Sequence, residues 1–194
     1  MAERLKAYAW KAYGWATASG VRIPLSPPVG ELLMDYELRL LGYCGLYCGA
    51  CNHYRSSFPE GKYLLEEGMK QGEDPHNYNC RGCRGELEYI HPGCDVCDIK
   101  SCAKEKGLAH CGLCSSFPCG KIIEFQHDDR HIHHLDVIDN LNELKEKGSE
   151  QWLKEQQKKW TCDCGMHFSW YETNCSNCGA GLTTYATNLR QKLD

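Results

Sequence analysis

The sequence CGLYCGAC, residues 44–51, opens a cysteine-rich stretch that ends at Cys119. CRGC follows at residues 80–83, and then come two units of the form C-x2-C-x4-C that lie 17 residues apart. The stretch contains 11 cysteines: Cys44, Cys48, Cys51, Cys80, Cys83, Cys94, Cys97, Cys102, Cys111, Cys114 and Cys119. Two thiolates separated by two residues can bind one ion from a tight turn, and two such turns complete a tetrahedral site. The stretch therefore predicts a domain that is held together by metal ions.

A second group of cysteines lies near the C-terminus and consists of Cys162, Cys164, Cys175 and Cys178. The two close pairs are separated by ten residues, and a glycine follows each pair. This arrangement is typical of a zinc ribbon, although the Cys-x-Cys spacing of the first pair is irregular. We expect zinc here, with a rubredoxin-like iron site as the alternative. Four protein ligands leave no open coordination position, so the expected role is structural.

Composition favours metal over disulfides. The chain has 194 residues with 15 cysteines and only 4 phenylalanines, and its mean hydropathy is -0.56. A large aliphatic core is not expected, and small domains with weak cores need disulfides or metals. Residues 1–20 carry four charged side chains and no apolar run typical of a secretory signal, and no segment has the length of a membrane span. We therefore expect a cytoplasmic, reduced protein, with disulfide scaffolding as the alternative.

The charge balance bears on the class of partner. The formal net charge is -4, and each four-cysteine zinc site adds about two negative charges. A non-specific nucleic-acid binder normally presents a basic face. Lys154, Lys158 and Lys159 form only a small basic patch, which Glu155 interrupts. A nucleic-acid partner is therefore not expected, and a protein partner or complex is.

The chain divides into four predicted segments: an aromatic-rich helical leader at 1–41, a cysteine-rich metal-binding domain at 42–124, a helical segment at 125–160 and a zinc-ribbon-like unit at 161–182. Short helices are expected from Glu60 to Met69 and from Ser101 to Leu108. Leu135, Ile138, Leu141 and Leu144 mark a further helix, and Gly148 is its expected end. The predicted fold class is a small, metal-stabilised, irregular α+β protein in which cysteine knuckles and short helices precede a helical linker and a rubredoxin-like zinc ribbon.

Several pairings of the core cysteines are compatible with the spacing. Two four-cysteine sites would use the four close pairs Cys48/Cys51, Cys80/Cys83, Cys94/Cys97 and Cys111/Cys114. The remaining Cys44, Cys102 and Cys119 would join a third centre with a histidine such as His53, His91 or His110, or would replace members of the pairs. A [4Fe-4S] cluster is the alternative, with Cys44, Cys48 and Cys51 as cofactor ligands together with one distant cysteine. We prefer zinc in the core.

A histidine-rich stretch follows the cysteine domain and contains His127, Asp128, Asp129, His131, His133 and His134. Spacings of three and four residues would place some of these side chains on one helix face. One interpretation is a histidine–carboxylate metal site with open positions. The other, which we prefer, is a solvated helix entry whose acids complement the helix dipole.

The chain resembles a prokaryotic cysteine-rich family that is catalogued only as a domain of unknown function (family 3795). The resemblance rests on YCGLYCGAC at 43–51, CRGCRG at 80–85, the run from Cys94 to Cys119 and GSEQWLKEQQKKWTCDCG at 148–165, and it spans residues 43–179. It implies a cytosolic protein, often from anaerobes, and no established activity. Membership of such a family gives no mechanism.

These observations lead to one functional hypothesis and two alternatives. The hypothesis is a metal-binding accessory or scaffold protein whose zinc sites stabilise a surface for docking a protein partner. The first alternative is an iron–sulfur electron-transfer subunit of a larger anaerobic redox complex. The second is a metalloenzyme that uses an open metal site or a reactive thiolate.

Overall fold

The computed structural model describes residues 38–187, so the predicted leader at 1–41 lies outside the described residues except for its last four positions. Seven α-helices lie in this range: α3 (Asn52–Arg55), α4 (Lys62–Lys70), α5 (Pro92–Asp95), α6 (Asp98–Glu105), α7 (Gly120–Gln126), α8 (Val137–Lys147) and α9 (Ser149–Lys159). Six 3-10 helices connect them: η1 (Cys48–Ala50), η2 (Pro59–Gly61), η3 (Pro75–Tyr78), η4 (Leu87–Tyr89), η5 (Cys111–Leu113) and η6 (Ile132–Asp136).

The protein is mostly helical, and residues 38–187 contain no β-strand. Three isolated antiparallel bridges are present: Leu41 with Tyr47, Thr161 with His167, and Asn174 with Gly181. Each bridge closes a short turn that contains cysteines, and the backbone pairing does not extend beyond that one residue pair. The β part of the predicted α+β class is therefore limited to bridges, because a metal knuckle needs a tight turn more than it needs paired strands.

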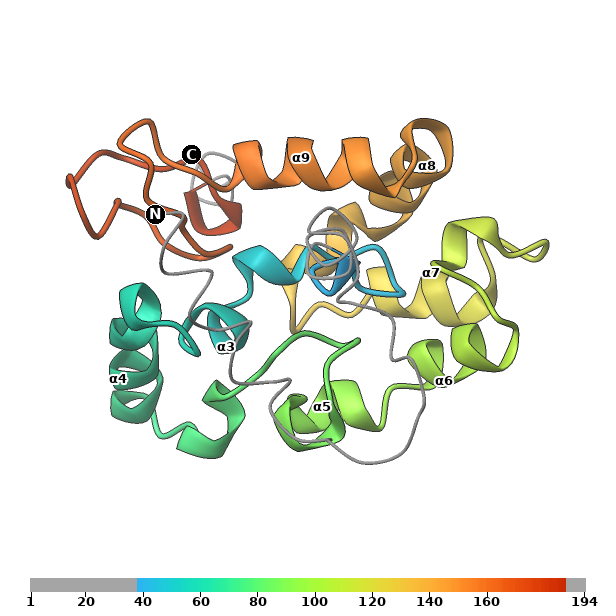
Figure 1. Cartoon of the computed structure of the whole chain (residues 1–194), viewed down its shortest axis with the longest axis horizontal. Helices are drawn as coiled ribbons and strands as arrows, with labels where there is room; N and C mark the ends of the chain where they lie inside the picture. Colours follow the sequence, from blue (N-terminus) through green and yellow to red (C-terminus); the bar gives the residue numbers. More distant parts are fainter. Residues whose placement is uncertain (1–37, 188–194) are drawn as a thin grey trace, which may run out of the picture.

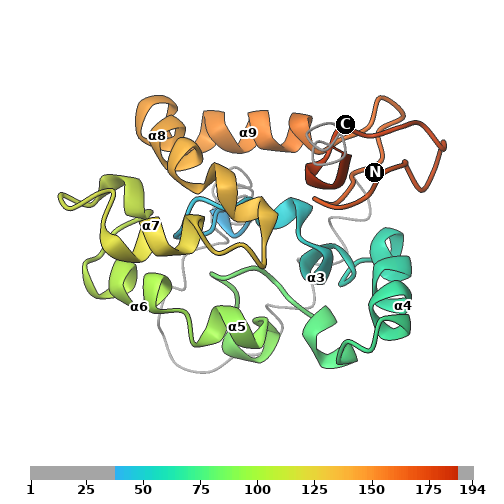
Figure 2. The same cartoon turned by 180° about the vertical axis from the view of Figure 1, so that it is seen from behind.

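The helices form two sides with a central segment between them (Figures 1 and 2). Helices α8 and α9 meet at Gly148 and lie on one side, with α8 running obliquely to α9, and α4, α5 and α6 follow the opposite side. The segment from η1 to α3 runs between the two sides, and the loops of the C-terminal four-cysteine unit extend beyond the end of α9. In the part of the chain that the structure describes, no helix is both long and apolar enough to cross a membrane.

A hydrophobic core runs through most of the described chain, from Leu41 to Leu182. Its largest fully buried side chain is Trp152 of α9, which meets the ring of Tyr47 edge-on with ring centroids 6.3 Å apart. The core joins the cysteine-rich segment, the α8–α9 pair and the C-terminal unit, so apolar packing contributes more than the composition suggested. Fifteen buried residues form this cluster.

Helix α8 has a buried stripe that differs from the predicted one. Val137, Leu141 and Leu144 are each at most 1 % exposed, whereas Leu135 is 53 % exposed. The reason is that Leu135 lies in η6, before α8 begins, so the stripe starts at Val137 and continues at positions four and seven residues later. Gly148 ends α8 as predicted, with a φ of 78°.

Two glycines let cysteine turns approach α8 closely. Gly45 has a φ of +86°, and a Cβ atom added there would lie 2.8 Å from Cγ of Leu141. A Cβ atom added at Gly112 would lie 2.6 Å from the carbonyl oxygen of the same leucine. Both positions require glycine because no side chain fits between turn and helix. The turns around Cys44 and Cys111 are thereby positioned against one point on α8.

Candidate metal centres

The C-terminal cysteines converge on one point. The sulfur atoms of Cys162, Cys164, Cys175 and Cys178 all lie within 4.8 Å of one another. The Sγ atoms of Cys162 and Cys178 are 3.7 Å apart, and those of Cys164 and Cys175 are 3.6 Å apart. Zinc–sulfur bonds of about 2.3 Å in a tetrahedron place sulfur atoms about 3.8 Å from each other. The geometry therefore fits a four-coordinate metal ion.

Two backbone turns aim these thiols at one another. The N–H of Gly165 donates to the carbonyl of Cys162 at 2.8 Å, and the N–H of Gly179 donates to the carbonyl of Cys175 at 2.9 Å. Gly165 and Gly179 have φ values of 87° and 75°, which L-amino acids with a side chain rarely adopt. The shorter Cys-x-Cys spacing of the first pair still allows both sulfurs to reach the site.

Contacts around the thiols tune and anchor the unit. The side-chain amide of Asn177 donates to Sγ of Cys164 at 3.5 Å. This hydrogen bond, together with one from the backbone of Met166, lowers the pKa of Cys164 to about 6. A thiol with a lowered pKa is more readily the thiolate that binds metal. Cys175 is buried beside the core, so the unit is attached to the packed interior.

Seven of the core cysteines come from three segments: the opening turn, the loop before η4 and the region of α5 and α6. They lie close enough to shift one another's pKa values, and they are Cys44, Cys48, Cys51, Cys80, Cys83, Cys94 and Cys97. Cys48 and Cys83 share a hydrogen bond, which lowers the pKa of Cys83 to about 6 and raises that of Cys48. Burial raises the pKa of Cys51 to about 11, and the nearby Cys80 adds to the shift. These thiols are thus neighbours, but the tight sulfur groups among the described residues do not include them.

The other core cysteines gather elsewhere. Cys102 of α6, Cys111 of η5, Cys114 and Cys119 line one small cavity beside α7. All 15 cysteines of the chain are free thiols. The histidines considered as extra ligands do not join them in a tight group within residues 38–187; His53, for example, packs against His91 at a centroid distance of 4.3 Å.

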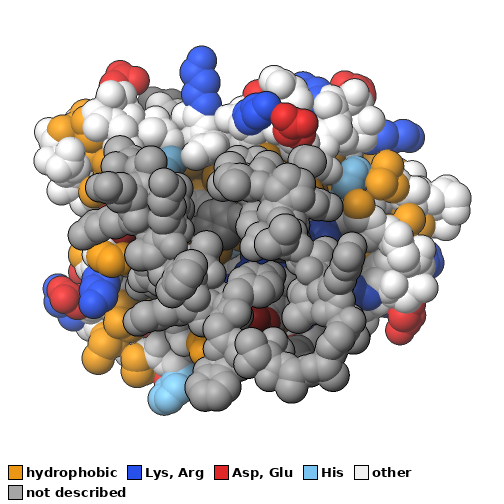
Figure 3. Space-filling view, in the orientation of Figure 1, with side chains coloured by type: hydrophobic (Ala, Val, Ile, Leu, Met, Phe, Trp, Pro, Cys, Tyr) orange, Lys and Arg blue, Asp and Glu red, His pale blue; other side chains and the backbone are white. Residues whose placement is uncertain are grey.

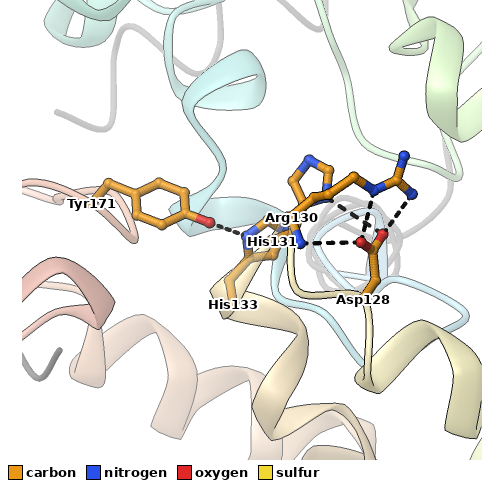
Figure 4. Close-up of polar contacts among 5 residues, drawn as sticks. All are labelled: Asp128, Arg130, His131, His133 and Tyr171. Atoms are coloured by element: carbon orange, nitrogen blue, oxygen red, sulfur yellow. Dashed lines mark hydrogen bonds and ion pairs between the residues drawn. The ribbon is translucent and has the colours of Figure 1, made fainter. Parts of the chain in front are cut away.

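The histidine-rich stretch forms a second tight ligand group. Ligand atoms of Asp128, His131 and His134 all lie within 4.8 Å of one another. Asp128 and His131 lie in the turn between α7 and η6, and His134 lies in η6, so the three side chains do not come from one face of an α-helix. Figure 4 shows Asp128 and His131 side by side with Arg130. Arg130 donates to the Asp128 carboxylate from Nε at 2.8 Å and from Nη2 at 2.9 Å.

His133 and His134 are buried, which the interpretation as a solvated helix entry did not anticipate. His133 stacks on Trp170 with ring centroids 4.0 Å apart, and its Nδ1 atom lies 2.5 Å from the hydroxyl of Tyr171 (Figure 4). Burial lowers the pKa of His134 to about 4, so its ring is neutral and able to bind a metal at neutral pH. The Nδ1 atom of His134 is buried and has no hydrogen-bond partner. Tyr171 was not among the predicted site residues, because a tyrosine 38 residues away along the chain carries no spacing signal.

The comparisons with known proteins add a family assignment. Residues 40–124 match the family model described as "Protein of unknown function (DUF3795)". This segment is a DUF3795 domain. No curated protein and no solved structure matches the chain.

The DUF3795 domain contains all 11 core cysteines and ends before the histidine-rich turn. The C-terminal four-cysteine unit and the group around His131 therefore lie outside the matched residues. The extension of the family resemblance to Gly179 stays a prediction.

Proposed function

We propose that this chain is a metal-binding accessory or scaffold protein in which zinc supports the fold and an exposed surface docks a protein partner. The observation that carries the proposal is the convergence of four thiols at the C-terminal site, with sulfur pairs at 3.6 and 3.7 Å. Four cysteine ligands complete the coordination of zinc and leave no position for a substrate or water. Such a site stabilises structure and does not catalyse.

The surface supports a protein partner better than a nucleic acid. Lys154 pairs with Glu150 at 2.7 Å, and Lys147 at the end of α8 pairs with Glu155 of α9 at 2.7 Å, so part of the basic charge of these two helices is neutralised. Figure 3 shows acidic and basic side chains interspersed along the edge where α9 lies. Val96 and Leu113 of the DUF3795 domain are 79 % and 51 % exposed and are our candidates for apolar docking contacts. The expected compartment is the cytoplasm, where thiols stay reduced.

Metal analysis of anaerobically purified full-length protein tests the proposal. We expect a colourless protein that contains zinc, and we expect the double variant Cys162→Ser/Cys178→Ser to lose one equivalent. Ser176→Ala is the matched control in the same loop and should keep the wild-type zinc content. A brown protein with iron and acid-labile sulfide would favour the iron–sulfur electron-transfer alternative, with Cys44, Cys48 and Cys51 among the cluster ligands. A protein free of metal would refute both.

A second candidate function follows from the group formed by Asp128, His131 and His134. Two histidines and one carboxylate are the ligand set of open metal sites that bind iron or zinc and keep positions for water or substrate. The unpartnered Nδ1 of buried His134 supports this candidate. Because Arg130 occupies the Asp128 carboxylate, binding requires that carboxylate to exchange part of its ion pair for the metal.

Cobalt(II) titration of zinc-loaded protein tests the second candidate. We expect one additional cobalt ion, and we expect His131→Ala and His134→Ala each to weaken its binding at least tenfold. His127→Ala is the control, because the His127 ring lies 2.7 Å from its own helix carbonyl at Ile123 and outside the ligand group. Equal cobalt affinity in all of these variants would eliminate the open site.

A further inference from the structure

Four cysteines from three different segments of the chain line one cavity in the DUF3795 domain. Cys102 comes from α6, Cys111 and Cys114 flank the η5 turn, and Cys119 directly precedes α7. The cavity that they line has a volume of about 20 Å³. This volume has room for about one water-sized sphere, and therefore for a single ion.

Local structure explains why these thiols meet. Helix α6 ends at Glu105, and Gly107 follows with a φ of +62°. The N–H of Leu108 donates to the carbonyl of Ala103 at 2.9 Å. The reversed chain brings the η5 turn back toward Cys102. In that turn, the N–H of Cys114 donates to the carbonyl of Cys111 at 3.0 Å, as in a metal knuckle.

The four thiols lie close enough to influence one another electrostatically, and a lysine lies beside them. Burial raises the pKa of Cys111 to about 11, and the charges of Cys119, Cys102 and Cys114 add to the shift. The ammonium group of Lys106 lies 3.6 Å from Sγ of Cys114 and also interacts with Cys102. Hydrogen bonds from Ser116 and the charge of Lys106 lower the pKa of Cys114. Lys106 therefore places a positive charge beside the thiols that line the cavity.

The rest of the cavity wall is mainly apolar. Leu108, Phe117 and Ile122 contribute to the lining, and Ile122 is 1 % exposed. An apolar wall gives water few hydrogen-bond partners, whereas thiolates prefer soft ions such as zinc. The composition of the lining therefore matches a thiolate-bound metal ion better than a bound water.

We propose that Cys102, Cys111, Cys114 and Cys119 bind one soft divalent metal ion, with zinc as the expected metal, and that Lys106 neutralises part of the charge of this second closed centre. The assignment deepens the proposed scaffold function, on which it rests, by naming one set of ligands in the core. It also departs from the pairing of close Cys-x2-Cys motifs, in which Cys102 and Cys119 were left over. The four sulfurs do not form one of the groups within 4.8 Å, so binding must draw them closer together.

The first test counts zinc in full-length variants that are purified under reducing conditions. We expect Cys102→Ser and Cys119→Ser each to lose one equivalent, or to bind it at least tenfold more weakly in competition with a chromogenic chelator. Ser115→Ala, in the same loop, should retain the wild-type content. Unchanged zinc content and affinity in both cysteine variants would overturn the assignment.

The second test uses the unmodified protein and so does not depend on whether a variant folds. Zinc is withdrawn stepwise with a chelator, and newly reactive thiols are alkylated and located by mass spectrometry. We expect Cys102, Cys111, Cys114 and Cys119 to become reactive together as one equivalent leaves. Labelling of Cys111 and Cys114 together with Cys94 and Cys97 would overturn the assignment, even if Cys162 and Cys178 behave as the proposed function requires. If no zinc is present at any site, the proposed function fails as well.

Discussion

The two cysteine-rich regions of this protein are organised differently. In the C-terminal unit, four thiols meet at sulfur distances of 3.6 and 3.7 Å, and two of those cysteines, Cys164 and Cys178, are exposed. In the DUF3795 domain, 11 thiols are distributed among short helices that also pack on a hydrophobic core. Both regions contribute buried residues to the core, so we expect only the loops that carry the exposed Cys164 and Cys178 to depend mainly on a bound metal.

Metal removal should give the largest effect and should separate the two regions. Structural zinc sites contribute about 10 kcal/mol or more to folding at neutral pH, so stripping zinc should unfold the two cysteine loops at 162–165 and 175–179. Amide hydrogen exchange should show loss of protection there while α8 and α9 remain protected around Trp152. Simultaneous loss of protection in α9 would mean that metals hold the whole molecule together and that the contrast between the regions is wrong.

Trp152→Ala should give the next largest effect and should act on the core. Trp152 is the largest fully buried side chain of the cluster, and truncation of such a side chain costs about 3–5 kcal/mol. Urea unfolding of zinc-loaded protein measures the loss. Leu135→Ala is the control, because its side chain is 53 % exposed and the change should stay within about 1 kcal/mol. Similar losses for the two variants would show that Trp152 does not anchor the core.

Gly45→Ala should have a smaller effect and tests the link between a cysteine turn and α8. The added methyl group would clash with Leu141, and the φ of +86° is unfavourable for alanine. Together these effects should cost about 2 kcal/mol or more, measured as a lowered urea midpoint. Gly72→Ala has the same φ of +86° without any atom within 4 Å, so it isolates the backbone contribution. Equal costs in the two variants would remove the steric part of the explanation.

Asn177→Ala should have the smallest effect and sharpens the description of the C-terminal site. Loss of the hydrogen bond to Cys164 should raise the pKa of that thiol, because the bond favours the thiolate. Protons then compete better with the metal, so zinc should be released at a higher pH than in the wild type. We expect an affinity loss of about tenfold, with Thr173→Ala as the control. An unchanged pH of release would show that Asn177 does not tune the site.

Sequence reasoning predicted the C-terminal site because its four cysteines have no competing cysteine nearby in the chain. The grouping of Cys102 with Cys111 could not be predicted, since it depends on the reversal at Gly107 after α6. Helix α4 lies at Lys62–Lys70, close to the expected range from Glu60 to Met69. Hydrophobic periodicity located α4, but it could not show where η6 ends and α8 begins.

The underestimate of the core has a physical cause as well. The expectation rested on the low number of aliphatic residues, whereas Trp152, Trp160 and Trp170 supply large apolar surfaces from few positions. The same aromatic surface supports His133, which stacks on Trp170. Composition alone does not reveal which tryptophans will be buried together.

The close packing of Gly45 and Gly112 on Leu141 has a consequence for the changes in length that this fold can accept. An α-helix advances by 100° per residue, so inserting one residue in α8 ahead of Leu141 would turn that leucine away from both cysteine turns. Relatives that share these turns should therefore tolerate insertions in the loops between the cysteines far more readily than a change in the length of α8.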